Sequence, residues 1–74
     1  MFKTRFGTHF EARYTKGDAY ITVWCLGREI DVINLSHLPG ETITRKQFIE
    51  EVADSKDYIV SAYDLDDVRM MPIS

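Results

Sequence analysis

The residues best suited to chemistry in this 74-residue chain are one cysteine, two histidines and a group of aspartates near its C-terminus. Cys25 lies among apolar neighbours and is predicted to face the core, where a thiol is chemically inert. His9 and His37 are far apart in the sequence, and one histidine beside one carboxylate is too small a ligand set for zinc. A single cysteine also excludes an internal disulfide.

The aspartates at positions 64, 66 and 67 resemble the start of a calcium-binding loop. Such a loop needs glycine at its sixth position and glutamate at its twelfth. Counted from Asp64, the sixth position is Arg69, whose charge repels a cation, and no glutamate follows. We therefore expect a solvated turn or helix cap here, and we predict neither a metal, a cofactor nor catalytic residues, so the chain is predicted not to be an enzyme.

Length and charge narrow the class of protein. The chain is predicted to form one domain over residues 1–74, with 9 basic and 12 acidic residues and a net charge of −3. Residues 1–16 hold four basic residues and one acidic residue, whereas residues 41–74 hold four basic and eight acidic ones. This balance disfavours nucleic acid as the partner. Apolar runs are too short to span a membrane and no secretion signal is visible, so a cytoplasmic location is expected.

Alternating apolar and polar residues predict a three-stranded meander over residues 10–14, 19–26 and 29–33. Two-residue turns are expected at Lys16–Gly17 and at Gly27–Arg28. Both turns predict the same inner, apolar face of the sheet. Its members are Phe10, Ala12, Tyr14, Ala19, Ile21, Val23, Cys25, Ile30 and Val32.

A helix is predicted to begin after Thr44, which with Gln47 forms a capping box. Its buried stripe is expected to be Phe48, Ile49, Val52 and Ala53, and its end to lie near residues 55–56.

Three further segments are less regular. Residues 58–63 are rich in β-branched and aromatic side chains and predict a fourth strand, whereas residues 68–71 fit either a short fifth strand or a helical turn. Residues 2–6 are expected to extend the first strand before a kink at Gly7. The predicted fold class is therefore α+β, a small antiparallel sheet of four to five strands with one amphipathic helix packed on one face.

The outer face of this sheet is the unusual surface. It is predicted to carry His9, Glu11, Arg13, Tyr20, Thr22, Trp24, Asp31 and Ile33. One helix covers only one face, so an aromatic and aliphatic cluster beside an arginine remains, the composition of a binding hot spot. The alternative is that the N-terminal segment or Met70, Met71 and Ile73 fold over it.

These features predict a small, acidic, non-catalytic interaction module that binds a protein partner and inhibits or modulates it. The small size and the acidic charge also fit an inhibitor of a host protein that a phage or plasmid encodes, and this is one expected origin of the module. The predicted contact residues are Trp24, Tyr20, Ile33 and Arg13, together with the helix acids Glu50, Glu51 and Asp54. A homodimer is a second mode, because a small core gains stability from a further interface. The alternative function is single-stranded nucleic-acid binding by stacking on the aromatic face.

Overall fold

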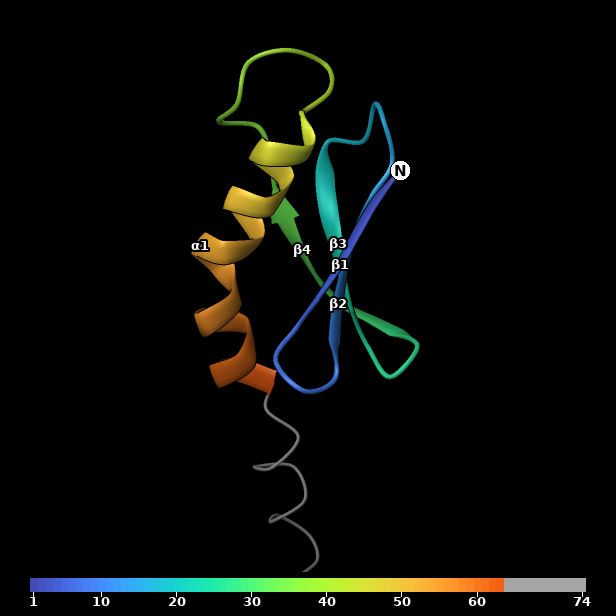
Figure 1. Cartoon of the computed structure of the whole chain (residues 1–74), viewed down its shortest axis with the longest axis vertical. Coiled ribbons are helices and arrows are strands. Elements are labelled where there is room, and N and C mark those ends of the chain that lie inside the picture. Colours follow the sequence, from blue (N-terminus) through green and yellow to red (C-terminus); the bar gives the residue numbers. More distant parts are fainter. Residues whose placement is uncertain (64–74) are drawn as a thin grey trace, which may run out of the picture.

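The computed structural model describes residues 1–63, which form four strands and one helix (Figure 1). The strands are β1 (Phe2–Phe6), β2 (Phe10–Tyr14), β3 (Tyr20–Cys25) and β4 (Arg28–Asn34), and the helix is α1 (Arg45–Tyr63). The strands form one antiparallel sheet in the order β1-β2-β3-β4, and α1 packs across one of its faces. The predicted α+β class is confirmed.

The first strand differs from the prediction. β1 does not extend β2 through a kink but pairs with it as a separate antiparallel strand, with Thr4 opposite Ala12. Gly7 has a φ of 61°, which favours glycine and lets the chain reverse there. A Cβ at Gly7 would also lie 3.0 Å from the Phe10 ring. The N-terminal segment therefore forms a sheet edge and does not fold over the outer face.

The hairpin between β2 and β3 keeps the predicted turn but pairs in a different register. The amide of Asp18 donates to the carbonyl of Thr15 at 2.9 Å, which closes the turn at Lys16–Gly17. Ala19, predicted to face inward, is exposed, and its carbonyl accepts a bond from the amide of Leu35 instead. Strand pairing is consequently displaced by two residues, an even shift that leaves each β2 and β3 side chain on its predicted face.

The hairpin between β3 and β4 contains the larger error. Its turn is formed by Leu26 and Gly27, both with positive φ, rather than by Gly27 and Arg28. Two positive φ values are those of a type I′ turn, whose twist matches the strands that it joins. Farther along, Trp24 is opposite Glu29 while Val23 is opposite Asp31, so one β4 residue bulges out of register.

Together, the displaced turn and the bulge reverse the faces predicted for the second half of β4, which follows the bulge. Ile33 faces inward with 7% of its surface exposed, whereas Val32 faces outward with 42% exposed. Asp31 also lies on the inner side, where its carboxylate accepts a bond from the Tyr63 hydroxyl at 3.2 Å. The predicted positions of Asp31, Val32 and Ile33 were therefore wrong, because a shift of one residue exchanges the faces.

The helix begins as predicted but is much longer. The Gln47 amide donates to Thr44 Oγ1 at 3.1 Å, and the Thr44 amide donates to Gln47 Oε1 at 2.9 Å. The helix then continues to Tyr63, so the strand predicted over residues 58–63 is wrong. Phe48, Val52 and Ile59 are its buried residues, at helical spacing, and their packing outweighs the β-propensity of the last turns.

Two residues of the predicted helical stripe are outside the core. Ile49 is 42% exposed and Ala53 is also exposed, because the side of α1 that faces the core carries Phe48, Val52 and Ile59 instead. The predictions for residues 68–71 and for the aspartates at 64, 66 and 67 lie outside the described residues.

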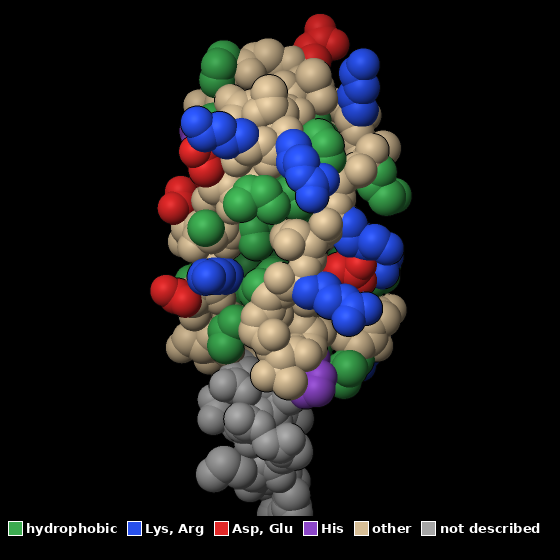
Figure 2. Space-filling model, in the orientation of Figure 1, with side chains coloured by type: hydrophobic (Ala, Val, Ile, Leu, Met, Phe, Trp, Pro, Cys, Tyr) green, Lys and Arg blue, Asp and Glu red, His purple; other side chains and the backbone are tan. Residues whose placement is uncertain are grey.

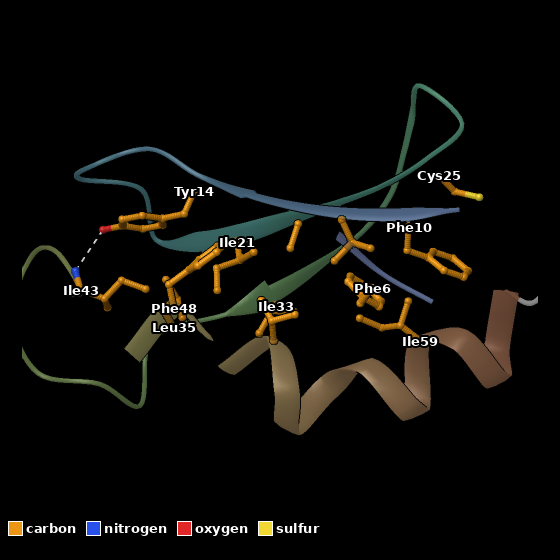
Figure 3. Close-up of a cluster of buried hydrophobic side chains, with 13 residues drawn as sticks. Phe6, Phe10, Tyr14, Ile21, Cys25, Ile33, Leu35, Ile43, Phe48 and Ile59 are labelled. Atoms are coloured by element: carbon orange, nitrogen blue, oxygen red, sulfur yellow. Dashed lines mark hydrogen bonds between the residues drawn. The ribbon is translucent and has the colours of Figure 1, made fainter. Parts of the chain in front are cut away.

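The core fills the space between the inner face of the sheet and α1 (Figure 3). Cys25 is buried in it, as predicted. Tyr14 is the side chain of this core that Figure 3 draws with a hydrogen bond. Its hydroxyl accepts from the Ile43 amide at 3.2 Å and donates to Thr42 Oγ1 at 3.1 Å. This pair of bonds ties the loop before α1 to the sheet. Within residues 1–63 no helix has the length and apolar character to cross a membrane.

Candidate interaction surface

The outer face is the side of the sheet that α1 leaves uncovered, and the strand register determines its members. They are Lys3 and Arg5 from β1, Glu11 and Arg13 from β2, Tyr20, Thr22 and Trp24 from β3, and Glu29, Val32 and Asn34 from β4. In the described part of the chain no element packs over this surface. Tyr20 is 43% exposed and Val32 is 42% exposed.

Trp24 is fixed at the centre of the outer face by contacts on two sides. The Arg13 guanidinium carbon lies 4.2 Å from the centroid of its ring, a cation–π contact. The indole Nε1 donates to Thr22 Oγ1 at 2.9 Å. Thr22 Oγ1 in turn donates to the backbone carbonyl of Arg13 at 3.3 Å. The aromatic ring is therefore held in one orientation before any partner arrives.

A short ion-pair network continues from Arg13 toward β1. The Arg13 guanidinium lies 3.0 Å from Glu11, and the Lys3 ammonium lies 3.5 Å from the other oxygen of the same carboxylate. The hydrogen bond from Arg13, with the positive charges of Arg13 and Lys3, holds the pKa of Glu11 below its ordinary value of 4.5. Glu11 is consequently ionised at neutral pH and orients both cations.

Arg13 is not fully satisfied in this arrangement. Its Nε is buried and has no hydrogen-bond partner within residues 1–63, although one terminal nitrogen is bound to Glu11. A buried unpaired donor costs stability, and arginine has further donors to offer. The buried Nε is out of reach of a partner, so an acceptor on a partner has to meet the terminal nitrogens of this side chain, which is 35% exposed and oriented by Trp24 and Glu11.

The predicted contact residues do not form one site. The structure brings Arg13, Tyr20 and Trp24 onto the outer face, as predicted, but places Ile33 in the core. Ile33 therefore cannot act as an anchor, and Val32 takes its place on the surface.

The helix acids lie on the opposite side of the molecule. Glu50 and Asp54 are exposed on α1, and α1 covers the inner face. Glu51 is half-buried and contacts the ring nitrogen Nε2 of His37 at 3.1 Å. These three acids consequently cannot contact the same small epitope as Trp24.

The predicted members of the outer face did not include Lys3 and Arg5. The signal was present, because they alternate with Phe2, Thr4 and Phe6 as strand residues do. Pairing with β2 was needed to place the two basic side chains beside Glu11.

A hollow of about 300 Å³ opens at one end of the outer face, between His9, Glu11 and Trp24. His9 is exposed there, in the turn between β1 and β2. Among residues 1–63 no three histidine, cysteine or acidic side chains are placed to hold a metal ion. The contacts described above orient groups for binding, with an aromatic ring, a guanidinium and a carboxylate as the available chemistry.

Comparison with known proteins identifies no relative. No protein-family model matches the chain, and no curated protein and no solved structure matches it significantly.

Proposed function

We propose that this chain is an interaction module that binds a protein partner through the outer face and inhibits or modulates that partner by covering part of its surface. The observation that supports this most directly is the preorganised Arg13–Trp24 pair on an uncovered sheet face. Tryptophan, tyrosine and arginine are the residue types most enriched in binding hot spots, and prior ordering reduces the entropy that binding costs.

The chemistry of the surface favours a partner of complementary charge and shape. Three basic side chains, Lys3, Arg5 and Arg13, surround Trp24 on the β1 and β2 side, and the Arg13 side chain is 35% exposed. A complementary partner presents an apolar pocket for Trp24 and Tyr20 with carboxylates on the adjacent rim. Such a module inhibits by occlusion, a mechanism suited to a phage- or plasmid-encoded inhibitor of a host protein.

Single-stranded nucleic acid is the second candidate, because basic and aromatic side chains share this face. The position of Arg13 over the Trp24 ring favours a protein instead, since a stacking base would have to displace the guanidinium. Trp24 is the single tryptophan, so its fluorescence reports either event. Quenching by an oligonucleotide that weakens steeply with salt would replace the protein proposal with this one.

The test compares capture by wild-type protein with capture by Trp24→Ala and Tyr58→Ala. Tyr58 is 68% exposed on α1, outside the outer face, and controls for loss of an aromatic ring elsewhere on the surface, whereas Trp24 is half-buried. A true partner binds wild type and Tyr58→Ala, whereas Trp24→Ala weakens binding by about 2–4 kcal/mol. Denaturant unfolding verifies that Trp24→Ala remains folded, with a loss of about 1–2 kcal/mol because the half-buried ring gives up both its cation–π contact and its hydrogen bond to Thr22.

Two outcomes contradict the proposal. One is that Trp24→Ala and wild type capture the same proteins with the same affinity, and the other is that neither captures a protein above background. Sedimentation of the free chain tests the homodimer, because a dimer through the outer face dissociates in Trp24→Ala and not in Tyr58→Ala.

A further inference from the structure

The first strand leaves one of its sides unpaired. The sheet order places β1 and β4 at the two edges. In the part of the chain that the structure describes, β1 pairs only with β2, so its other lateral edge has no partner strand. Backbone amides and carbonyls on such an edge are available to a strand from another molecule.

A groove lies directly beside this edge, between β1 and α1. Its lining residues are Thr4, Arg5 and Phe6 from β1 and Ile49, Val52, Ala53 and Lys56 from α1. The groove has a volume of about 140 Å³ and is open to solvent. Ile49, one of these lining residues, is 42% exposed. Figure 2 shows hydrophobic side chains gathered in a band between the helix and the strands, with basic side chains on both sides.

Both charged side chains that line the groove are basic, whereas the exposed acid Asp57 lies four residues after Ala53 on α1 and Glu11 lies 3.5 Å from Lys3. Arg5 and Lys56 line it, and Lys3 precedes Arg5 by two residues on the same face of β1. On α1, Arg45 lies four residues before Ile49, on the same flank of the helix. The exposed acid Glu50 is turned about 100° from Ile49, toward solvent.

The opposite edge of the sheet has a different character. The cavity beside β4 is lined by Asp31 and Glu51 together with His37. β4 also contains the bulge, which interrupts the regular edge that an added strand needs. The groove beside β1 therefore suits an acidic segment better than the cavity beside β4 does.

A second copy of this chain is a poor occupant of the β1 edge. If two β1 strands paired in antiparallel fashion about Thr4, Lys3 of each would be opposite Arg5 of the other. Like charges directly opposite one another destabilise a strand pair. The occupant must therefore bring acidic residues of its own.

We propose that the groove between β1 and α1 binds an extended peptide segment of a partner, in which acidic and apolar residues alternate, as a fifth strand on β1. Alternate side chains of an added strand point to opposite faces of the sheet. Peptide side chains that point to the outer face lie beside Lys3 and Arg5 and are acidic. Peptide side chains that point toward α1 lie beside Ile49 and Ala53 and are apolar. Backbone bonds to β1 supply affinity, and the two rows of side chains supply specificity.

The test uses a short fluorescein-labelled peptide that alternates glutamate and valine, measured by fluorescence anisotropy at low salt. A matched peptide that alternates lysine and valine is the control for sequence. We expect the acidic peptide to bind at least about tenfold more tightly. Methylation of alternate backbone amides of the acidic peptide abolishes binding, because the strand can no longer pair with β1.

Charge-matched variants locate the site. Arg5→Glu weakens binding at least about tenfold, whereas Arg28→Glu, an equal charge change on β4, leaves it nearly unchanged. Ile49→Glu likewise weakens binding, and Tyr58→Glu on the opposite flank of α1 does not. All four positions are exposed, so each variant should fold.

Equal binding of the two peptides overturns the proposal, as does undetectable binding of the acidic peptide or equal weakening by Arg5→Glu and Arg28→Glu. Trp24→Ala separates this site from the outer face. We expect that substitution to leave peptide binding intact, and a loss of peptide binding in Trp24→Ala would assign the peptide to the outer face instead.

Discussion

The inner and outer faces of the sheet are built from alternate residues of the same strands, but they differ in how many polar side chains they hold and in how exposed these side chains are. On the inner face, Tyr14 makes two bonds to the loop before α1, Asp31 accepts one bond from Tyr63, and the other buried side chains are apolar. On the outer face, Arg13, Glu11 and Lys3 form a half-exposed network around Trp24. The comparison indicates that stability comes mainly from the inner face, which leaves the outer face free to serve binding.

The sharpest test of this division uses two adjacent residues of β4. Ile33→Ala empties a core position that is 7% exposed and should cost about 2–5 kcal/mol of unfolding free energy. Val32→Ala, on the outer face, should change it by only about 0.5 kcal/mol. Urea unfolding of both variants measures the difference, and a larger effect at Val32 would mean that β4 has the register predicted from sequence.

Tyr14→Phe tests the polar anchor that joins the inner face to the loop before α1. The substitution leaves the buried Ile43 amide without its acceptor and should destabilise the protein by about 1–3 kcal/mol. Tyr20→Phe is the matched change on the outer face, where the ring is 43% exposed, and should be nearly neutral. Equal effects in thermal unfolding would show that the Tyr14 hydroxyl does not hold the loop.

The start of α1 determines whether the inner face is covered. Thr44→Ala removes the acceptor of the Gln47 amide and should cost about 0.5–2 kcal/mol, accompanied by fraying of the first turn. Thr42 is a poor control, because its hydroxyl accepts from Tyr14. Thr8→Ala, in the exposed turn after β1, serves better and should have little effect on helix content by circular dichroism.

The turn that sets the register of β4 can be improved. Leu26 has a φ of 52° and is 67% exposed, so it bears the cost of a left-handed conformation and contributes little burial. Leu26→Asn creates the Asn–Gly pair that type I′ turns favour and should stabilise the protein by about 1 kcal/mol. A destabilised variant would indicate that Leu26 has packing partners that compensate for its conformation.

Acid and alkali should act on different faces. The pKa of Glu11 is lowered by Arg13 and Lys3, so its contribution is present above its ordinary value of 4.5 and is lost as the pH falls. The pKa of Tyr63 is raised by its bond to the Asp31 carboxylate, so its contribution is present below pH 10 and is lost as the pH rises.

Two variants test whether Glu11 and Tyr63 cause the loss of stability at low and at high pH. Glu11→Gln should flatten the acid limb of unfolding free energy against pH, and Tyr63→Phe should flatten the alkaline limb. An unchanged acid limb in Glu11→Gln would show that other carboxylates dominate it.

Much of the fold could be predicted from local patterns. Strict alternation placed β2 and β3 and their inner residues, and the capping box placed the start of α1. The candidate site was predicted in part, since Arg13, Tyr20 and Trp24 lie together, whereas the helix acids and Ile33 do not join them.

The errors share a physical cause. Residues 58–63 are β-formers by composition, but Ile59 continues the buried line of Phe48 and Val52, and packing against the sheet keeps them helical. In β4 both candidate turns contain Gly27, and strand twist selects the one that needs positive φ at Leu26. Neither choice is visible in a local window.

The sequence by itself determined which residues are apolar at period two, where α1 starts, and that one face of the sheet would be charged and aromatic. Only the tertiary structure decided the face of each β4 residue, the separate β1 strand, and the groove beside it. Side-chain period and caps depend on neighbours within a few residues, whereas register depends on twist, bulges and the packing of distant segments.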